Sequence, residues 1–199
     1  EMERALLSQL STFPNIHLLN HCFVVDLLTQ HHLGYLVTKS TLDITCYGVY
    51  VLNLQTNQIE KIVSKIVLLA SGGCGQAYRT TTNPKIATGD GIAMAFRANA
   101  TIKDMEFIQF HPTALYDSSA GSKFLISEAV RGFGAYLRTQ KGHRFMMDYD
   151  ERGELASRDI VSQSIDLELK KSGNDCVYLD CTHLDLDAFM KHFPMIYER

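Results

Sequence analysis

"KIVLLASGGCGQAYRTTTNP", residues 65–84, carries the pattern from which we predict the fold. Its opening run is almost entirely apolar, which predicts a buried strand over residues 65–70. The run ends in Gly72, Gly73 and Gly75, and glycines after a buried strand allow a ligand to approach the backbone closely. The full G-x-G-x-x-G pattern is absent, so the residues alone leave a nucleotide loop and a simple tight turn both open.

The segment that follows, "ATGDGIAMAFRANA", residues 87–100, predicts a helix that begins near Asp90. The N–H groups and the dipole at a helix N-terminus favour an oxygen-rich ligand. Asp90 is itself an anion, so it would repel a phosphate but accept a hydrogen bond from a sugar or polyol hydroxyl. The alternative is that Asp90 only caps the helix.

The segments before residue 65 predict a small antiparallel meander that leads into the buried strand. They are rich in Val, Leu and Ile, and "QTNQ", residues 55–58, is a turn candidate between two of them. The strand-like runs are residues 16–30, 34–40, 44–54 and 59–70.

"EFIQFHPTALY", residues 106–116, is an apolar run that predicts a second buried strand, ending on His111. Pro112 restricts His111 to extended backbone angles and so limits where the imidazole points. Thr113 adds a hydroxyl on the same turn. A single histidine at a strand end is more often structural than ligand-binding, so both interpretations remain.

"SEAVRG", residues 127–132, predicts a short helix. Glu128 and Arg131 lie three residues apart in it, a spacing that favours a weak surface ion pair.

"ELASRDIVSQSIDLELKKSGND", residues 154–175, predicts the longest helix, capped by Ser157 and stopped at Gly173. Arg158 would then lie at the positive end of the helix dipole, which is unfavourable for a cation. Either the guanidinium meets an anion or donates a proton there, or it is a surface arginine paired with Asp159. The residues alone favour the surface pair.

Composition excludes several classes of protein. The 199 residues carry a net charge of −3, and the scattered Lys and Arg residues form no stripe for nucleic acid. The apolar runs are much shorter than the roughly 20 residues of a membrane span. The 5 cysteines include no Cys-x-x-Cys, which argues against a disulfide framework or a metal site and for a reducing cytoplasm.

Taken in order, the segments quoted above and "VYLDCTHL", residues 177–184, resemble the flavoprotein family of succinate dehydrogenase, fumarate reductase and L-aspartate oxidase. The resemblance covers about residues 60–199, and residues 1–60 more weakly. "HPTALY", "SEAVRG" and "DERGEL" are similar to the L-aspartate oxidase branch. Two departures stand out: Phe133 stands where glutamate is common, and Ser127 where threonine is common.

The resemblance implies an α/β (α+β) fold in two parts. Residues 1–103 would be a partial FAD-binding domain of the glutathione-reductase-like kind with its β-meander. Residues 104–199 would be a truncated α+β capping domain that binds substrate. The family's N-terminal G-x-G-x-x-G motif and C-terminal substrate residues are not in these 199 residues, so we expect a central piece that binds FAD weakly and is inactive alone.

The resemblance also implies a reaction: hydride transfer between a four-carbon dicarboxylate and FAD. In the L-aspartate oxidase branch, L-aspartate becomes iminoaspartate on the quinolinate route to NAD. The implied catalytic residues are Arg158, which shuttles a proton, and Glu128; the implied substrate-binding residues are His111, Ser127 and Thr113; the implied FAD-binding residues are Asp90, Gly72, Gly73 and Val24.

Two alternatives remain. The first is a fumarate reductase or succinate dehydrogenase flavoprotein subunit, and the second is a non-catalytic domain that binds a small anion. In all three cases we expect unpaired sheet edges to favour a homo-oligomer.

Overall fold

The structure is a computed structural model that describes residues 2–38, 40–117 and 121–199. Its internal contacts divide the chain into two compact units. Unit 1 comprises Glu1–Ser71 and Asp90–Ile102, and unit 2 comprises Gly72–Gly89 and Lys103–Arg199. The assignment of FAD-binding and capping roles to residues 1–103 and 104–199 stays a prediction.

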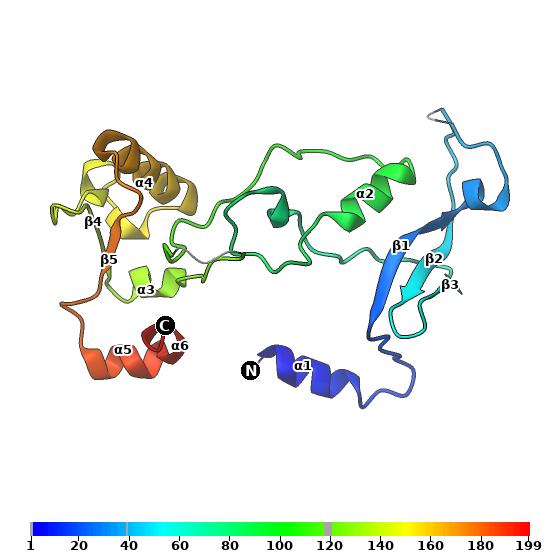
Figure 1. Ribbon diagram of the computed structural model, residues 1–199, viewed down its shortest axis with the longest axis horizontal. Helices are drawn as coiled ribbons and strands as arrows, with labels where there is room; N and C mark the ends of the chain where they lie inside the picture. Colours follow the sequence, from blue (N-terminus) through cyan, green and yellow to red (C-terminus); the bar gives the residue numbers. More distant parts are fainter. Residues whose placement is uncertain (1, 39, 118–120) are drawn as a thin grey trace. The chain divides into compact units, whose positions relative to one another are not determined.

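Unit 1 is built on an antiparallel sheet in the order β1-β2-β3, shown in blue and cyan in Figure 1. This confirms the predicted meander, and "QTNQ" lies at the β2–β3 turn, where Asn57 takes a left-handed backbone conformation. The elements are α1 (Met2–Leu10), β1 (Cys22–Thr29), the 3₁₀ turn η1 (Gln30–Leu33), β2 (Cys46–Asn53), β3 (Gln58–Val63) and α2 (Asp90–Arg97).

Helix α2 packs on β1 and begins at Asp90, as its sequence predicts. Leu27 and Leu28 of β1 and Met94 of α2 are buried. The helix is also tied to the strand by an ion pair, in which Arg97 Nε lies 2.9 Å from Asp26 Oδ2. Burial of three apolar side chains, at roughly 1.5–3 kcal/mol each, exceeds the contribution of this exposed pair.

The buried strand predicted at residues 65–70 is wrong. Among the described residues no strand pairs with this segment, and Ile66 and Leu68 are 85% and 86% exposed. An apolar run forms a strand only where a neighbour satisfies its backbone hydrogen bonds. For the same reason the run at residues 34–40 is not a strand where it is described; position 39 lies outside the described residues.

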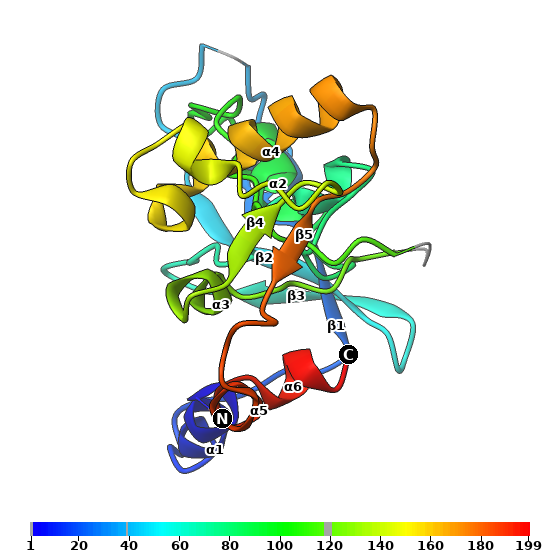
Figure 2. The ribbon, with the colours of Figure 1, turned by 90° about the vertical axis from the view of Figure 1, so that its left-hand side faces the viewer.

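Unit 2 contains a small antiparallel sheet of β4 and β5, with most of its helices around it. Figure 2 shows the two strands as adjacent arrows. The elements are η2 (Gly75–Ala77), α3 (Glu128–Gly132), β4 (Tyr136–Arg138), η3 (Met146–Asp148), η4 (Gly153–Leu155), α4 (Arg158–Ser172), β5 (Tyr178–Asp180), α5 (Leu186–His192) and α6 (Pro194–Tyr197).

The core of unit 2 has two apolar clusters that share Leu179 of β5. One joins β4 to α4 through Leu137, Phe145 and Val161, which are at most 1% exposed. This packing holds the N-terminus of α4, and therefore Arg158, in a defined place.

The second cluster joins α3 to α5 and α6 through aromatic rings. The ring of Phe133, just after α3, lies 6.2 Å from that of Phe189 and 5.5 Å from that of Phe193, both edge to face. The imidazole of His192 lies 5.1 Å from the Phe133 ring. Such pairs add about 0.5–1.5 kcal/mol each beyond the area that they bury.

The strand predicted at residues 106–116 is also wrong. The segment is extended, but among the residues that the structure describes it makes one isolated bridge, between Ala114 and Leu125, and Phe107 is 75% exposed. The three predicted helices, α2, α3 and α4, form, and α4 ends where Gly173 adopts a left-handed conformation. Ser157 stands at the N-cap of α4, but its side chain does not make the predicted capping bond.

Other features limit the kinds of site present. All five cysteines are free thiols. Within the described ranges, no cluster of three or more His, Cys, Asp or Glu side chains could hold a metal ion. In the same ranges, no helix is both long and apolar enough to cross a bilayer.

Candidate active site

A short backbone pairing brings two predicted site segments together. Ile126 N donates to Thr113 O over 3.0 Å, and Thr113 Oγ1 donates to Ile126 O over 2.8 Å. His111 lies two residues before this pairing and Ser127 directly after it. The pairing therefore places the imidazole segment beside the N-terminus of α3.

Arg158 makes two directional contacts at the start of α4. Its Nε donates to Glu128 Oε2 over 2.6 Å, and its Nη1 donates to Gln109 Oε1 over 3.0 Å. The expected surface pair between Arg158 and Asp159 is wrong, because Glu128 is the carboxylate that Arg158 contacts. That partner is 30 residues away in sequence, so local spacing could not reveal it.

Arg131 differs most from its prediction. The predicted ion pair with Glu128 forms, but the Arg131 side chain is fully buried rather than at the surface. Its Nη1 donates to the main-chain oxygen of Glu154, and its Nη2 lies 3.8 Å from Glu128 Oε1. Within the described chain its Nε and Nη2 have no hydrogen-bond partner. Burial lowers the pKa of Arg131 from its usual value.

Glu128 thus lies between two guanidinium groups, one buried and one exposed. The hydrogen bond from Arg158 lowers the pKa of the Glu128 carboxyl, and the charges of Arg158 and Arg131 act in the same direction. The carboxylate is therefore ionised at neutral pH.

His111 is held as a neutral donor. Thr113 N donates to His111 Nδ1 over 3.2 Å, so the ring proton of the neutral imidazole resides on Nε2. Burial lowers the pKa of His111, and the neighbouring charges of Arg158 and Arg131 lower it further. A neutral Nε2–H can donate a hydrogen bond to a carboxylate oxygen.

The two hydroxyls predicted at the site have structural contacts. Ser127 caps α3, because its Oγ accepts from Ala129 N over 3.2 Å, and its own proton can still be donated to a ligand. Thr113 is 6% exposed and donates to Ile126 O, so here it positions the segment of His111.

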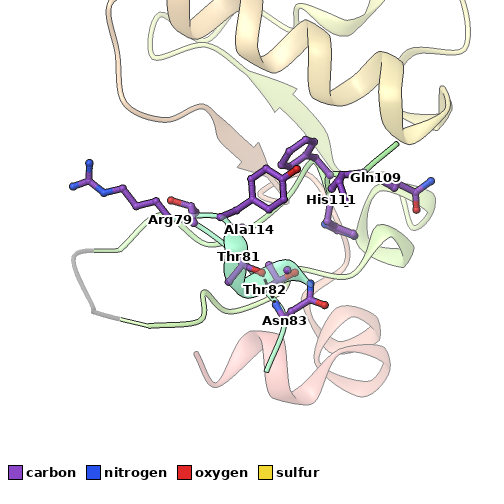
Figure 3. A pocket seen from close by; sticks show the side chains of 12 residues that line it. Arg79, Thr81, Thr82, Asn83, Gln109, His111 and Ala114 are labelled. Carbon is purple, nitrogen blue, oxygen red and sulfur yellow. Dashed lines mark hydrogen bonds between the residues drawn. The ribbon is translucent and has the colours of Figure 1, made fainter. Parts of the chain in front are cut away.

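A cavity of about 460 Å³ lies beside His111. Gln109, Phe110 and His111 line one side, and the threonine-rich loop of residues 78–83 lines the other. Figure 3 shows these lining residues, with the Gln109 and Arg79 side chains extending to opposite sides of the view. The cavity wall therefore combines an imidazole, amides and hydroxyls, which suits a small polar ligand.

The predicted FAD-binding residues fall in both units: Gly72 and Gly73 in unit 2, and Asp90 and Val24 in unit 1. A Cβ added at either glycine would meet nothing within 4 Å, so the backbone is open to a ligand. Asp90 is exposed at the first turn of α2, where its carboxylate can accept a hydroxyl. Val24 lies in β1. Taken separately within each unit, the open glycine backbone and the Asp90 carboxylate have the chemistry that backbone-contacting and hydroxyl-rich parts of FAD require.

Comparison with known proteins identifies the family. A family profile described as "FAD binding domain" matches residues 1–199. The chain belongs to this family. This match confirms the flavoprotein resemblance and the FAD cofactor, both of which the sequence analysis predicted.

Among the relatives of this FAD-binding-domain chain are L-aspartate oxidases. That of Yersinia pestis is 48% identical over 199 residues, covering 100% of this chain and 36% of that protein. L-aspartate oxidase 2-b, chloroplastic, of Nicotiana tabacum is 49% identical over 203 residues, covering 98% of this chain and 30% of that protein. The chain thus spans about a third of the length of these relatives.

Solved structures support the same family. A quinol-fumarate reductase with menaquinol molecules superposes with a TM-score of 0.82 at 31% identity, covering 99% of this chain and 34% of that chain. A quinol fumarate reductase of E. coli gives a TM-score of 0.81 at 30% identity with the same coverage. The mixed α/β character predicted from the sequence is confirmed.

Proposed function

We propose that the protein containing this chain is an FAD-dependent oxidoreductase that converts L-aspartate to iminoaspartate, the reaction of the quinolinate route to NAD. The observation that carries the proposal is the Arg158–Glu128 contact of 2.6 Å in a chain 48% identical to an L-aspartate oxidase; Arg158 also bonds Gln109, which lines the His111 cavity. The reaction requires a carboxylate-binding group and a proton carrier, and we assign both roles to residues of unit 2.

His111 and Ser127 bind one carboxylate of the substrate in this proposal. The Nε2–H of neutral His111 and the hydroxyl of Ser127 both donate, and neither introduces a negative charge. Thr113 orients the imidazole, because its backbone N–H donates to His111 Nδ1 while its hydroxyl is bonded to Ile126 O.

Arg158 and Glu128 carry the proton. Forming the imine removes a hydride from carbon and a proton from nitrogen, and the proton needs a path to solvent. Arg158 is 42% exposed and Glu128 45% exposed, so the pair joins the site to water. General acid–base catalysis of this kind contributes roughly 10²–10⁴-fold to the rate.

FAD supplies the hydride acceptor when bound. Asp90 would accept a hydroxyl of the cofactor, and Gly72, Gly73 and Val24 would lie against it through their backbones. In this proposal residues 1–103 contribute to the FAD-binding domain and residues 104–199 to the capping domain. A cytoplasmic location remains a prediction of the cysteine pattern, and chloroplastic relatives also exist.

The experiment uses the complete protein in which this chain occurs. With FAD and oxygen, L-aspartate should yield peroxide, and succinate should fail to reduce a dye. Dye reduction by succinate without peroxide from L-aspartate would instead identify the fumarate reductase or succinate dehydrogenase activity, which the superposition on quinol fumarate reductase favours as the second candidate. Neither reaction, with a small dicarboxylate still bound, would identify an anion-binding protein.

A further inference from the structure

Glu154 is a buried carboxylate that the reaction proposed above does not use. It is 3% exposed. Arg144 donates to it twice, from Nη2 to Oε2 over 2.6 Å and from Nε to Oε1 over 3.0 Å. Leu137 N donates to Oε1 over 3.1 Å. Burial raises the pKa of Glu154, but the hydrogen bonds from Arg144 and from backbone N–H groups lower it more, so the buried group stays ionised.

The main chain of Glu154 holds Arg131. The carbonyl oxygen of Glu154 accepts from Arg131 Nη1, and within the described residues the other two nitrogens of that guanidinium have no hydrogen-bond partner. This bond anchors the buried cation at one nitrogen, and its Nη2 lies 3.8 Å from Glu128 Oε1. We expect a shift of the anchor to change this separation.

The same turn leads into α4. Glu154 is the middle residue of η4 (Gly153–Leu155), and Arg158 begins α4 three residues after that turn. Gly153, the first residue of this turn, has a φ of +55°, a left-handed conformation that glycine adopts without strain. The turn thus binds one arginine that flanks Glu128 and leads directly to the other.

We propose that Glu154 is a positioning residue for the Glu128–Arg158 pair: its carboxylate, clamped by Arg144 and Leu137 N, fixes the turn that places Arg131 and Arg158 on either side of Glu128. The functional consequence of this placement rests on the proton-carrying role proposed above for that pair.

Glu154→Gln tests the proposal, because it keeps the shape of the side chain and removes the charge that Arg144 clamps. The readout is the titration of the Glu128 carboxyl carbon by NMR in the complete FAD-loaded protein without substrate, assigned by its loss in Glu128→Gln. If the turn relaxes and the arginines withdraw, the pKa of Glu128 rises. If the arginines do not move, loss of the negative charge of Glu154 would lower the pKa of Glu128 instead.

Turnover provides a second readout. We expect kcat for L-aspartate to fall about tenfold with KM nearly unchanged, a smaller loss than the roughly 10²–10⁴-fold that a general acid–base group itself contributes. The acid limb of the pH–rate profile should move to higher pH, because Glu128 must be ionised to accept a proton. Glu168→Gln is the matched control: Glu168 is also a partly buried carboxylate, but it is bonded to Tyr149 and Lys171.

A Glu128 pKa that is unchanged or lower in Glu154→Gln would overturn the proposal, as would an equal rise in Glu168→Gln. If Glu154→Gln does not fold, Arg144→Lys decides, since lysine keeps the charge but loses the two-point clamp. In Arg144→Lys, a rise of the Glu128 pKa smaller than that expected for Glu154→Gln supports the proposal, and an unchanged Glu128 pKa overturns it. The titration requires no turnover, so it stands even if L-aspartate proves not to be the substrate.

Discussion

Glu128 derives its chemical character from two arginines in different environments. Arg158 is close to solvent and makes a short hydrogen bond to it, whereas Arg131 is buried and acts mainly through its charge. An exposed donor on one side and a buried cation on the other suit the proton-carrying role proposed for Glu128.

Arg158→Lys should nearly abolish L-aspartate oxidation while FAD remains bound. A lysine has one nitrogen and cannot contact Glu128 and Gln109 in the same directions as the guanidinium. We expect a loss of roughly 10²–10⁴-fold in kcat, measured as peroxide release, with unchanged flavin absorbance in the complete protein.

Arg152→Lys is its control, because Arg152 lies in the same stretch but pairs with Asp150 instead of Glu128. Activity near the normal level in Arg158→Lys would remove Arg158 from the mechanism.

His111 should titrate below its ordinary pKa of about 6.5. Since burial and then the charge of Arg158 lower its pKa, Arg158→Gln should move the value upward, measured by NMR of the imidazole carbons. The sign also applies to stability: the folded state resists protonating His111, so stability is lost as the pH falls below about 6.5. Arg152→Gln should leave the titration of His111 unchanged. A shift of the His111 pKa equal to that in Arg158→Gln would show that any loss of positive charge has this effect.

At the scale of elements, capping differs between two helices that start with similar residues. Asp185 caps α5 through a bond of 2.7 Å from Ala188 N, whereas the Ser157 side chain makes no capping bond to α4. Asp185→Ala should therefore lower the free energy of unfolding by about 1 kcal/mol. Ser157→Ala should lower it by less, measured by denaturant titration of both variants. Equal losses would contradict the difference in capping.

Helices were predictable where the signals are local. Gly173 stops α4 because only a left-handed residue closes that turn, and this can be inferred from a short stretch of sequence. Strands need a partner, so the apolar runs at residues 65–70 and 106–116 were misassigned. The three-residue strand β4 has too short a pattern to detect.

The candidate site was predictable only in part. His111, Glu128 and Arg158 are brought together as the family resemblance implies, but their roles remain predictions. The burial of Arg131 was missed, because spacing along α3 shows which residues are neighbours and not what covers them. The clamp between Glu154 and Arg144 depends on tertiary packing and has no signature in the sequence.

At the scale of the molecule, unit 1 presents an open sheet edge and uncovered apolar residues. Strand β3 pairs on one side with β2, and Val63, Ile66 and Leu68 are 74%, 85% and 86% exposed. We therefore expect the 199-residue chain, expressed alone, to self-associate and to retain little FAD. Size-exclusion chromatography with light scattering and flavin absorbance measure the two effects.

The double variant Ile66→Lys/Leu68→Lys should reduce this association. The matched control is Leu36→Lys/Leu42→Lys, which changes two equally exposed leucines, 87% and 94%, elsewhere in unit 1. A monomeric, stably yellow chain would show that these 199 residues are sufficient for folding and for FAD.

The ring of Phe133 has a consequence for how this protein has evolved. Glutamate is common at this position in the family that the chain resembles, but here the ring packs edge to face against Phe189 and Phe193. A carboxylate in the same place would lie among aromatic edges, with only the imidazole of His192 among the rings packed on Phe133 able to donate to it. Positions 133, 189 and 193 should therefore have changed together, and orthologues with an acidic residue at 133 should carry smaller or polar side chains at the other two.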